Sequence, residues 1–165
     1  LLLMKIIKAI GFLILFLVMS CTSKETESSR INSKLITRYD YNQNELDLAK
    51  LINEYRKSIG LNDLELNNHL SYKSEEHNLY MIDNNVVNHA YFQERLENSI
   101  NVLAAVKVDE IVAYNYVLPK GALTAWLISP SHKAAIEGDF TNFGIAISKS
   151  NKSGKNYYTV IFIKK

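Results

Sequence analysis

The sequence is short of several features that define common classes of protein. It contains a single cysteine, Cys21, so no disulfide bond can form within the chain. Its formal net charge is only +2, and the lysines that are dense in sequence stand near its two ends, at Lys5 and Lys8 and at Lys164 and Lys165. No stripe of alternating basic and aromatic residues joins them. We therefore expect no nucleic-acid partner.

The motifs of common hydrolases are missing as well. The sequence has no His-Glu-x-x-His zinc motif, and no serine or threonine stands in a nucleophile elbow. These absences count against the usual protease mechanisms and favour a protein that binds rather than cleaves.

The N-terminal segment resembles a bacterial lipoprotein signal peptide. Met4 is the expected start, Lys5 and Lys8 form a short basic region, and an apolar run covers 9–18. That run is shorter than the roughly 20 residues that a membrane helix needs. It leads into Val-Met-Ser-Cys at 18–21, which resembles a lipobox. We expect cleavage before Cys21 and acylation of that cysteine by palmitate or a similar chain; plain secretion and an uncleaved anchor are the alternatives.

The chain is expected to carry one folded domain behind this leader. With 165 residues, 47% of them hydrophobic, it can bury one sizeable core. We divide it into a signal peptide at 1–20, a polar tether at 21–44 and a domain at 45–165. Within the tether, Ile31, Leu35 and Ile36 could form a short docking segment.

Apolar periodicity and turn chemistry predict the elements of this domain. Asn44 is expected to cap the first helix, and Gly60 suits a left-handed stop after it. Helices are predicted over 45–59, 68–82, 91–102 and 119–128. With Ser129 as N-cap and Pro130 at the first position, a further short helix is predicted to carry 132–136. Strands are predicted over 110–117, 143–148 and 157–163. The last two strands form a hairpin. This order indicates an α+β fold in which helices cover a small antiparallel sheet.

Five short segments carry a resemblance to a known family. They are Val-Asn-His at 87–89, Asp-Glu-Ile-Val-Ala at 109–113, Trp-Leu-Ile-Ser-Pro-Ser-His at 126–132, Thr-Asn-Phe-Gly-Ile at 141–145 and Tyr-Tyr-Thr-Val at 157–160. Their order and spacing resemble the bacterial branch of the CAP superfamily, also called SCP-like extracellular proteins. The resemblance covers the chain from about Glu45 to its end. It implies an α-β-α sandwich and a polar cleft that collects His89, Glu110 and His132.

The sequence also departs from the family pattern. Ile111 replaces the asparagine that usually follows the glutamate, and Tyr157 stands where animal and plant members carry a histidine. Ser129 stands where those relatives carry a further glutamate. A metal-binding tetrad of that kind is therefore incomplete.

Two interpretations of the three cleft residues stay open. His89, Glu110 and His132 could bind Zn²⁺ or another divalent cation with water at an open position. Alternatively, Glu110 accepts hydrogen bonds from both imidazoles in a network that ties loops to the sheet. Of the other histidines, His77 is expected in the core beside Met81, and His69 in solvent.

Three functions are compatible with these residues. The first is a membrane-anchored, non-catalytic lipoprotein of the cell envelope, extracytoplasmic at the outer membrane or cell surface, that binds a small molecule, a peptide or an envelope component through the cleft. The second is a peptidase-like hydrolase that uses His89, Glu110 and His132. The third is carriage of a lipid or sterol, which some family members show.

Overall fold

The computed structural model describes residues 34–165; the predicted signal peptide, Cys21 and the tether up to residue 33 lie outside the described residues. The elements are α1 (Gln43–Ser58), β1 (Glu65–Leu66), α2 (Asn68–Asn84), α3 (Phe92–Leu103), β2 (Lys107–Tyr114), α4 (Pro119–Ile128), α5 (Pro130–Ile136), β3 (Asn142–Lys149) and β4 (Asn156–Lys164). Every helix and the hairpin predicted above are present. The β2 strand ends earlier than predicted because Asn115 adopts a left-handed conformation, with φ 67°.

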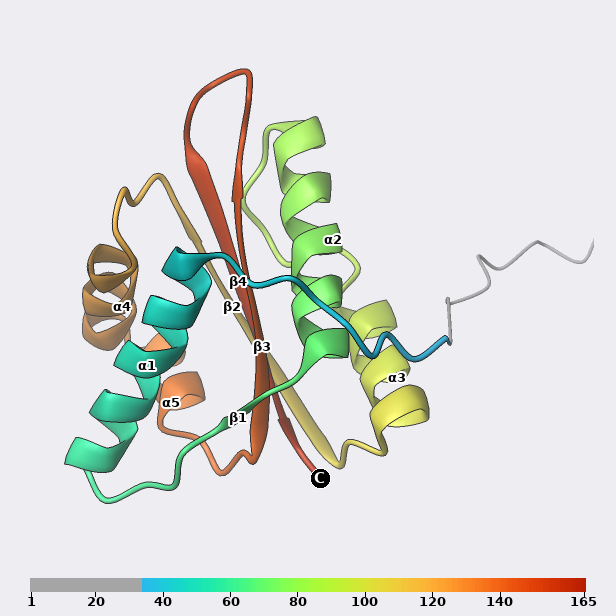
Figure 1. Ribbon diagram of the computed structural model, residues 1–165, viewed down its shortest axis with the longest axis vertical. Coiled ribbons are helices and arrows are strands. Elements are labelled where there is room, and N and C mark those ends of the chain that lie inside the picture. The colour runs from blue at the N-terminus through green and yellow to red at the C-terminus, as the bar shows by residue number, and fades with distance from the viewer. Residues whose placement is uncertain (1–33) are drawn as a thin grey trace, which may run out of the picture.

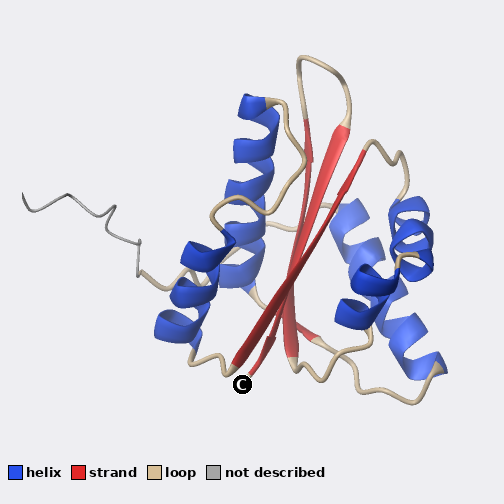
Figure 2. Cartoon of the chain, turned by 180° about the vertical axis from the view of Figure 1, so that it is seen from behind, coloured by secondary structure: helices blue, strands red, loops and turns tan. Residues whose placement is uncertain are grey.

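These elements form three layers (Figures 1 and 2). Helices α1, α4 and α5 cover one face of the sheet, and α2 and α3 cover the other. The larger apolar cluster lies on the first face, where Ile52 of α1, Trp126 of α4 and Phe162 of β4 are all buried. The indole N–H of Trp126 donates to the carbonyl oxygen of Val112 at 2.9 Å, which fixes this buried ring against β2. The α-β-α sandwich is confirmed.

The sheet is mixed rather than purely antiparallel. Its strand order is β1-β3-β4-β2, and β2, β4 and β3 pair antiparallel. The two-residue strand β1 pairs parallel with β3, which corrects the expected antiparallel sheet. Two residues are too few to show the apolar–polar alternation of a strand, so the residue pattern did not predict β1.

Beyond that short pairing, side chains satisfy the outer edge of β3. The backbone N–H of Ile145 donates to the Ser71 hydroxyl of α2 at 2.9 Å, and Asn78 of α2 donates to the carbonyl oxygen of Ala146 at 3.0 Å. Helix α2 can approach this closely because residue 144 is glycine: a Cβ there would lie 2.2 Å from the backbone of Leu70. An otherwise open strand edge is thereby closed by a helix.

The residues before α1 are bound to the domain. The backbone N–H of Ile36 donates to His69 Nδ1 at 3.1 Å, and Asn68 donates to the carbonyl oxygen of Thr37 at 2.7 Å. We call residues 34–42 the strap; it runs past α2 to the start of α1 (Figure 1). The prediction that His69 lies in solvent is wrong, because the strap covers it and its Nε2 bonds Asn98 of α3 at 2.6 Å.

The ends of α1 follow local chemistry. Asn42, rather than the predicted Asn44, caps the helix: its side chain accepts from the N–H of Glu45, and the Glu45 carboxylate accepts from the N–H of Asn42. Gly60 has φ 81° in the left-handed region, as predicted. Within residues 34–165, no helix combines the length and apolar character that crossing a membrane requires.

Candidate functional site

The site is built where the loop after α2 meets the edge strand β2. Asn85 ends α2 in a left-handed conformation, and Tyr91, also left-handed, starts the turn into α3. Between them, the loop carries His89 to β2, where its Nδ1 lies 2.9 Å from Glu110 Oε1. Two of the three predicted cleft residues are thus in direct contact.

Arg95 of α3 is the residue that the sequence analysis missed. Its Nε donates to Glu110 Oε2 at 2.6 Å and its Nη2 to Oε1 at 2.7 Å, a bidentate ion pair. Its Nη1 donates to the carbonyl oxygen of Ala90 at 2.8 Å and so holds the loop beside His89. The available signal was spacing: Arg95, Ser99 and Leu103 recur every four residues and form the buried stripe of α3.

The Glu110 carboxylate is ionised in this environment. Burial raises its pKa, but the hydrogen bonds from His89 and Arg95 and the charge of Arg95 outweigh burial, so the net pKa is below the usual range. Since the carboxylate only accepts, the Nδ1 of a neutral His89 ring must carry the proton. Its Nε2 is then left as an acceptor.

His77 of α2 completes the buried side of the site. Its burial confirms the prediction, and its Nε2 donates to the carbonyl oxygen of Asn88 at 2.8 Å. The same nitrogen lies 3.8 Å from Glu110 Oε1. Burial lowers the pKa of His77, and the charge of Arg95 lowers it further, so the ring is neutral. Its Nδ1 has no hydrogen-bond partner among the described residues.

His132 approaches the same strand from the other face of the sheet. It lies on α5, and its Nδ1 is 2.8 Å from the hydroxyl of Ser129. Burial lowers the pKa of His132, a positive charge on His89 would lower it further, and the Asp109 carboxylate opposes both. The expectation that Glu110 accepts from both imidazoles is wrong, because Glu110 points toward α2 and α3.

An open pocket of about 260 Å³ lies over the pair, lined by His89, Phe92, Asp109 and Glu110. We call it the His89 pocket. The Glu110 side chain is 1% exposed, whereas that of His89 is 47% exposed. A molecule in the pocket therefore meets the imidazole and not the carboxylate behind it.

The described residues do not fit the metal centre that the sequence left open. Between residues 34 and 165, no three His, Cys, Asp or Glu side chains are grouped so that they could hold a metal ion. The chemical reason lies at Glu110, whose two oxygens are both occupied by the Arg95 guanidinium. We therefore derive no step through a metal.

Comparison with known proteins places this geometry in a family. The profile of CAP, the cysteine-rich secretory protein family, matches residues 49–162. The uncharacterized membrane protein YlbC of Bacillus subtilis is 30% identical over 127 residues, which are 73% of this chain and 34% of that protein. The chain thus spans about a third of the length of this curated relative.

Solved structures show the same architecture. An outer surface protein of Borrelia burgdorferi superposes with a TM-score of 0.68 at 26% identity, covering 77% of this chain and 96% of that one. An extracellular protein of Bacillus anthracis that contains an SCP domain gives a TM-score of 0.64 at 24% identity, covering 74% of this chain and 40% of that chain. The second likeness bears on the fold alone.

Proposed function

The chain belongs to the CAP family, the cysteine-rich secretory proteins, and we propose that it is a membrane-anchored lipoprotein whose extracytoplasmic domain binds a ligand through the His89 pocket. The location is supported by the similar Borrelia burgdorferi protein, which is named as an outer surface protein. The anchor is supported by the lipobox-like sequence that ends at Cys21.

The state of Glu110 is the observation that carries the binding proposal. Arg95 already neutralises this carboxylate, so Glu110 serves to orient the His89 ring rather than to take a proton from a substrate. Among the described residues, no hydroxyl or thiol is bonded to His89 as an activated nucleophile would be. The pocket therefore offers a fixed acceptor, Nε2, beside the apolar ring of Phe92. That pair suits a small ligand group with an O–H or N–H next to an apolar part.

NMR titration with a panel of small alcohols, amines, sugars and short peptides tests this proposal. We expect shift changes at His89, Phe92 and Asp109, and their loss in His89→Ala. Lys57→Ala is the control, because that side chain lies on α1, away from the pocket, and its loss should leave binding unchanged. Shift changes confined to other regions, or retained in His89→Ala, would refute the assigned pocket.

A hydrolase is the second candidate, and one observation favours it. A histidine whose Nδ1 is held by a carboxylate is also the arrangement of a general base, and Nε2 of His89 could activate a water molecule. His132 would assist from across the strand. Cleavage of a broad peptide library that disappears in both His89→Ala and Glu110→Gln would establish this activity in place of simple binding.

Lipidation needs its own test. Metabolic labelling with radioactive palmitate should mark the wild-type protein and not Cys21→Ser, since the chain has no other cysteine. Label that persists in the variant would overturn the lipoprotein assignment without touching the pocket.

A further inference from the structure

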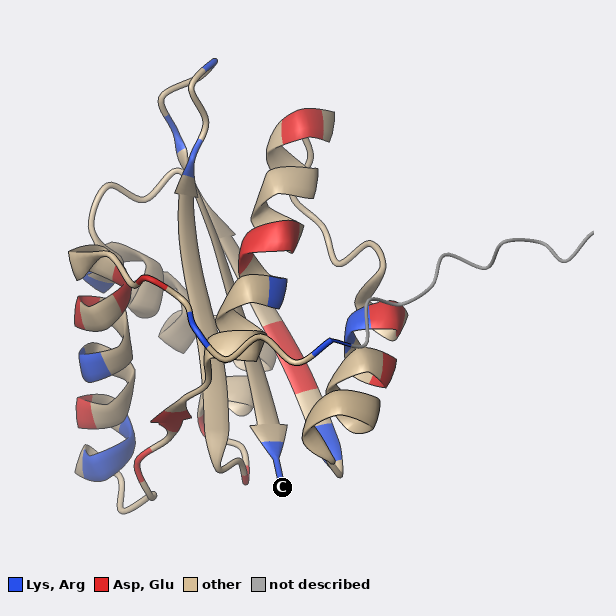
Figure 3. Ribbon diagram, turned by 45° about the vertical axis from the view of Figure 1, so that its right-hand side comes forward, with Lys and Arg blue, Asp and Glu red and all other residues tan. Residues whose placement is uncertain are grey.

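The turn of the β3–β4 hairpin is basic. Three exposed lysines, Lys149, Lys152 and Lys155, surround the turn, which projects beyond the helices (Figure 3). None of the three forms an ion pair with a described residue, and the chain contains no acidic residue from position 140 to 165. Because they are spaced three residues apart, they do not form a basic run in the sequence. The turn brings them together at one tip.

Exposed aliphatic side chains lie at the same end. Val117 is 80% exposed and Leu118 is 65% exposed, in the loop that leads from β2 to α4. This loop is fixed to the base of the hairpin: the N–H of Asn115 donates to the carbonyl oxygen of Asn156 at 2.8 Å, and the Asn156 side chain donates to the carbonyl oxygen of Tyr116 at 3.0 Å. Figures 1 and 2 show the loop and the hairpin at one end of the sheet. We call the turn 149–155 and the loop 115–118 together the tip surface.

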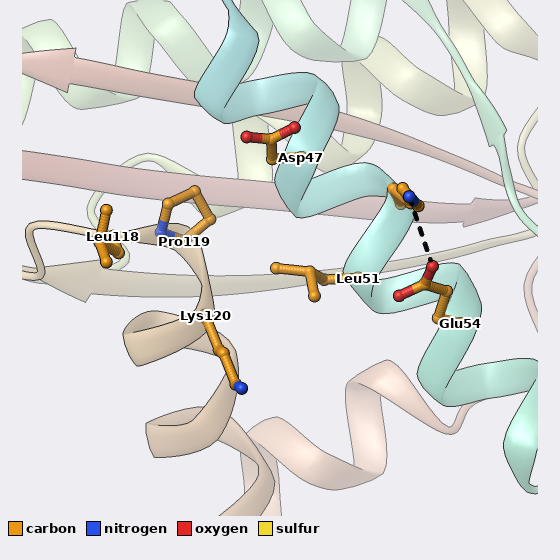
Figure 4. Close-up of a pocket in the computed structure, with 7 residues that line it drawn as sticks. Asp47, Leu51, Glu54, Leu118, Pro119 and Lys120 are labelled. Carbon is orange, nitrogen blue, oxygen red and sulfur yellow. Dashed lines mark ion pairs between the residues drawn. The ribbon is translucent and has the colours of Figure 1, made fainter.

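The neighbouring groove marks where this surface ends. A pocket of about 330 Å³ lies between α1 and α4, and acidic Asp47 and Glu54 line it together with Lys50 and Lys120 (Figure 4). Lys50 is paired with Glu54 at 3.7 Å. Mixed charge of this kind gives no net attraction for an anion, so the groove adds none to the tip surface, which it meets at Leu118.

We propose that the tip surface docks on the anionic headgroups of a lipid bilayer. Lysines near a negatively charged membrane each strengthen binding by roughly fivefold. Val117 and Leu118 are exposed apolar side chains that can enter the headgroup boundary of a bilayer. A dissolved polyanion offers no apolar region for such side chains. This contact is independent of His89 and of acylation at Cys21.

Docking by this end would fix how the domain stands on the membrane. Glu110 lies four residues before Tyr114, the last residue of β2, which places the His89 pocket about 13 Å from that end of the strand. The pocket would then remain open to solvent while the tip surface rests on lipid.

Lysine acetylation of the full chain, mixed with vesicles, tests the proposal. Vesicles of phosphatidylcholine alone are compared with vesicles that also contain phosphatidylglycerol, and modification is read residue by residue by mass spectrometry. We expect Lys149, Lys152 and Lys155 to react at least about fivefold more slowly on the anionic vesicles. Lys57 and Lys133 are internal references that should not change. Equal rates at the tip on both vesicles would overturn the proposal.

Two sets of variants identify the attraction. Lys120 lies two residues after Leu118, beside the tip surface, and should also react more slowly on the anionic vesicles, so it serves as the reporter when the three tip lysines are replaced. Lys→Gln at 149, 152 and 155 should abolish the protection of Lys120, whereas Lys→Gln at 50, 57 and 133, which removes the same charge, should keep it. Val117→Ser with Leu118→Ser should weaken it on anionic vesicles. Protection that is unchanged by this double substitution would mean attraction by charge alone and would contradict the entry of the two aliphatic side chains into the lipid. Flotation on phosphatidylcholine vesicles reports the N-terminal anchor separately.

Discussion

Two buried arginines show how the same side chain can serve a closed and an open part of one molecule. Arg56 of α1 is fully buried and donates to neutral acceptors only, the carbonyl oxygens of Asn62, Ile136 and Gly138 among them. Arg95 of α3 is nearly as buried but donates to the ionised Glu110. The groups bonded to Arg56 belong to the protein interior, whereas Glu110 also contacts His89, whose imidazole is half exposed.

The comparison separates a structural from a functional use of buried charge. Arg56 ties the end of α1 to the last residue of α5 and to the segment after it, and it needs no change of protonation to do so. The Arg95–Glu110 pair holds a loop and sets the orientation of a ring that solvent can reach. A buried ion pair adds little net stability compared with apolar packing. Its position behind an exposed histidine therefore favours a role at the pocket.

Removing Arg56 should cause the largest loss of stability. Arg56→Met leaves several buried carbonyl oxygens without donors, and we expect the free energy of unfolding to fall by about 3–5 kcal/mol at every pH where the protein folds. Urea denaturation followed by Trp126 fluorescence measures it. Arg38→Met is the control: that side chain is 86% exposed, and its loss should change stability by no more than about 0.5 kcal/mol. A loss below about 1 kcal/mol for Arg56→Met would mean that water satisfies those carbonyls.

Removing Arg95 should cause a smaller loss of stability, and that loss should depend on pH. Arg95→Met leaves the Glu110 charge with the His89 hydrogen bond, so we expect a loss of about 2–4 kcal/mol at neutral pH, toward the low end of what breaking a buried ion pair costs. In the wild type the lowered pKa of Glu110 stabilises the fold above the ordinary value of 4.5, and this contribution disappears as pH falls through the lowered pKa. The variant lacks that contribution, so its deficit should shrink in acid. Adding Glu110→Gln should restore more than half of the loss; a double variant as unstable as the single one would refute the coupling.

The smallest effect is the titration of the buried histidines. Burial lowers the pKa of His77, so the unfolded chain takes up a proton below about 6.5 while the folded protein does not. Stability should therefore fall as pH drops below that value, by at most about 1.4 kcal/mol per pH unit for each such histidine, until the folded pKa is reached. His77→Gln keeps a donor for Asn88 and should flatten the slope, measured by urea denaturation between about pH 7.5 and 5.5. An unchanged slope would assign the effect to His69 or His132, whose pKa values burial also lowers.

The sequence predicted what local pattern and family resemblance can carry. Apolar periodicity, helix-start signals and turn chemistry located all five helices of the described residues and the terminal hairpin. The resemblance singled out His89, Glu110 and His132, of which the first two are bonded to each other. The sequence did not indicate β1, because a strand of two residues is too short to show an alternation of apolar and polar residues.

Contacts between distant segments account for what was missed. His69 looked exposed because the strap and α3, which bury it, lie far away in sequence. Arg95 is surrounded in sequence by Gln93, Glu94 and Glu97, and a segment of this composition is typical of a solvated helix face. Only the fold turns it toward a carboxylate fifteen residues away.

The protonation of His89 tests the central claim most directly. If an ionised Glu110 orients this ring, nitrogen NMR of protein labelled in its histidines should find the proton of the neutral imidazole on Nδ1. Glu110→Gln, which can accept or donate at that position, should lower this preference. A wild-type His89 whose proton resides on Nε2 would contradict the account, because the carboxylate would then not be holding the ring that faces the pocket.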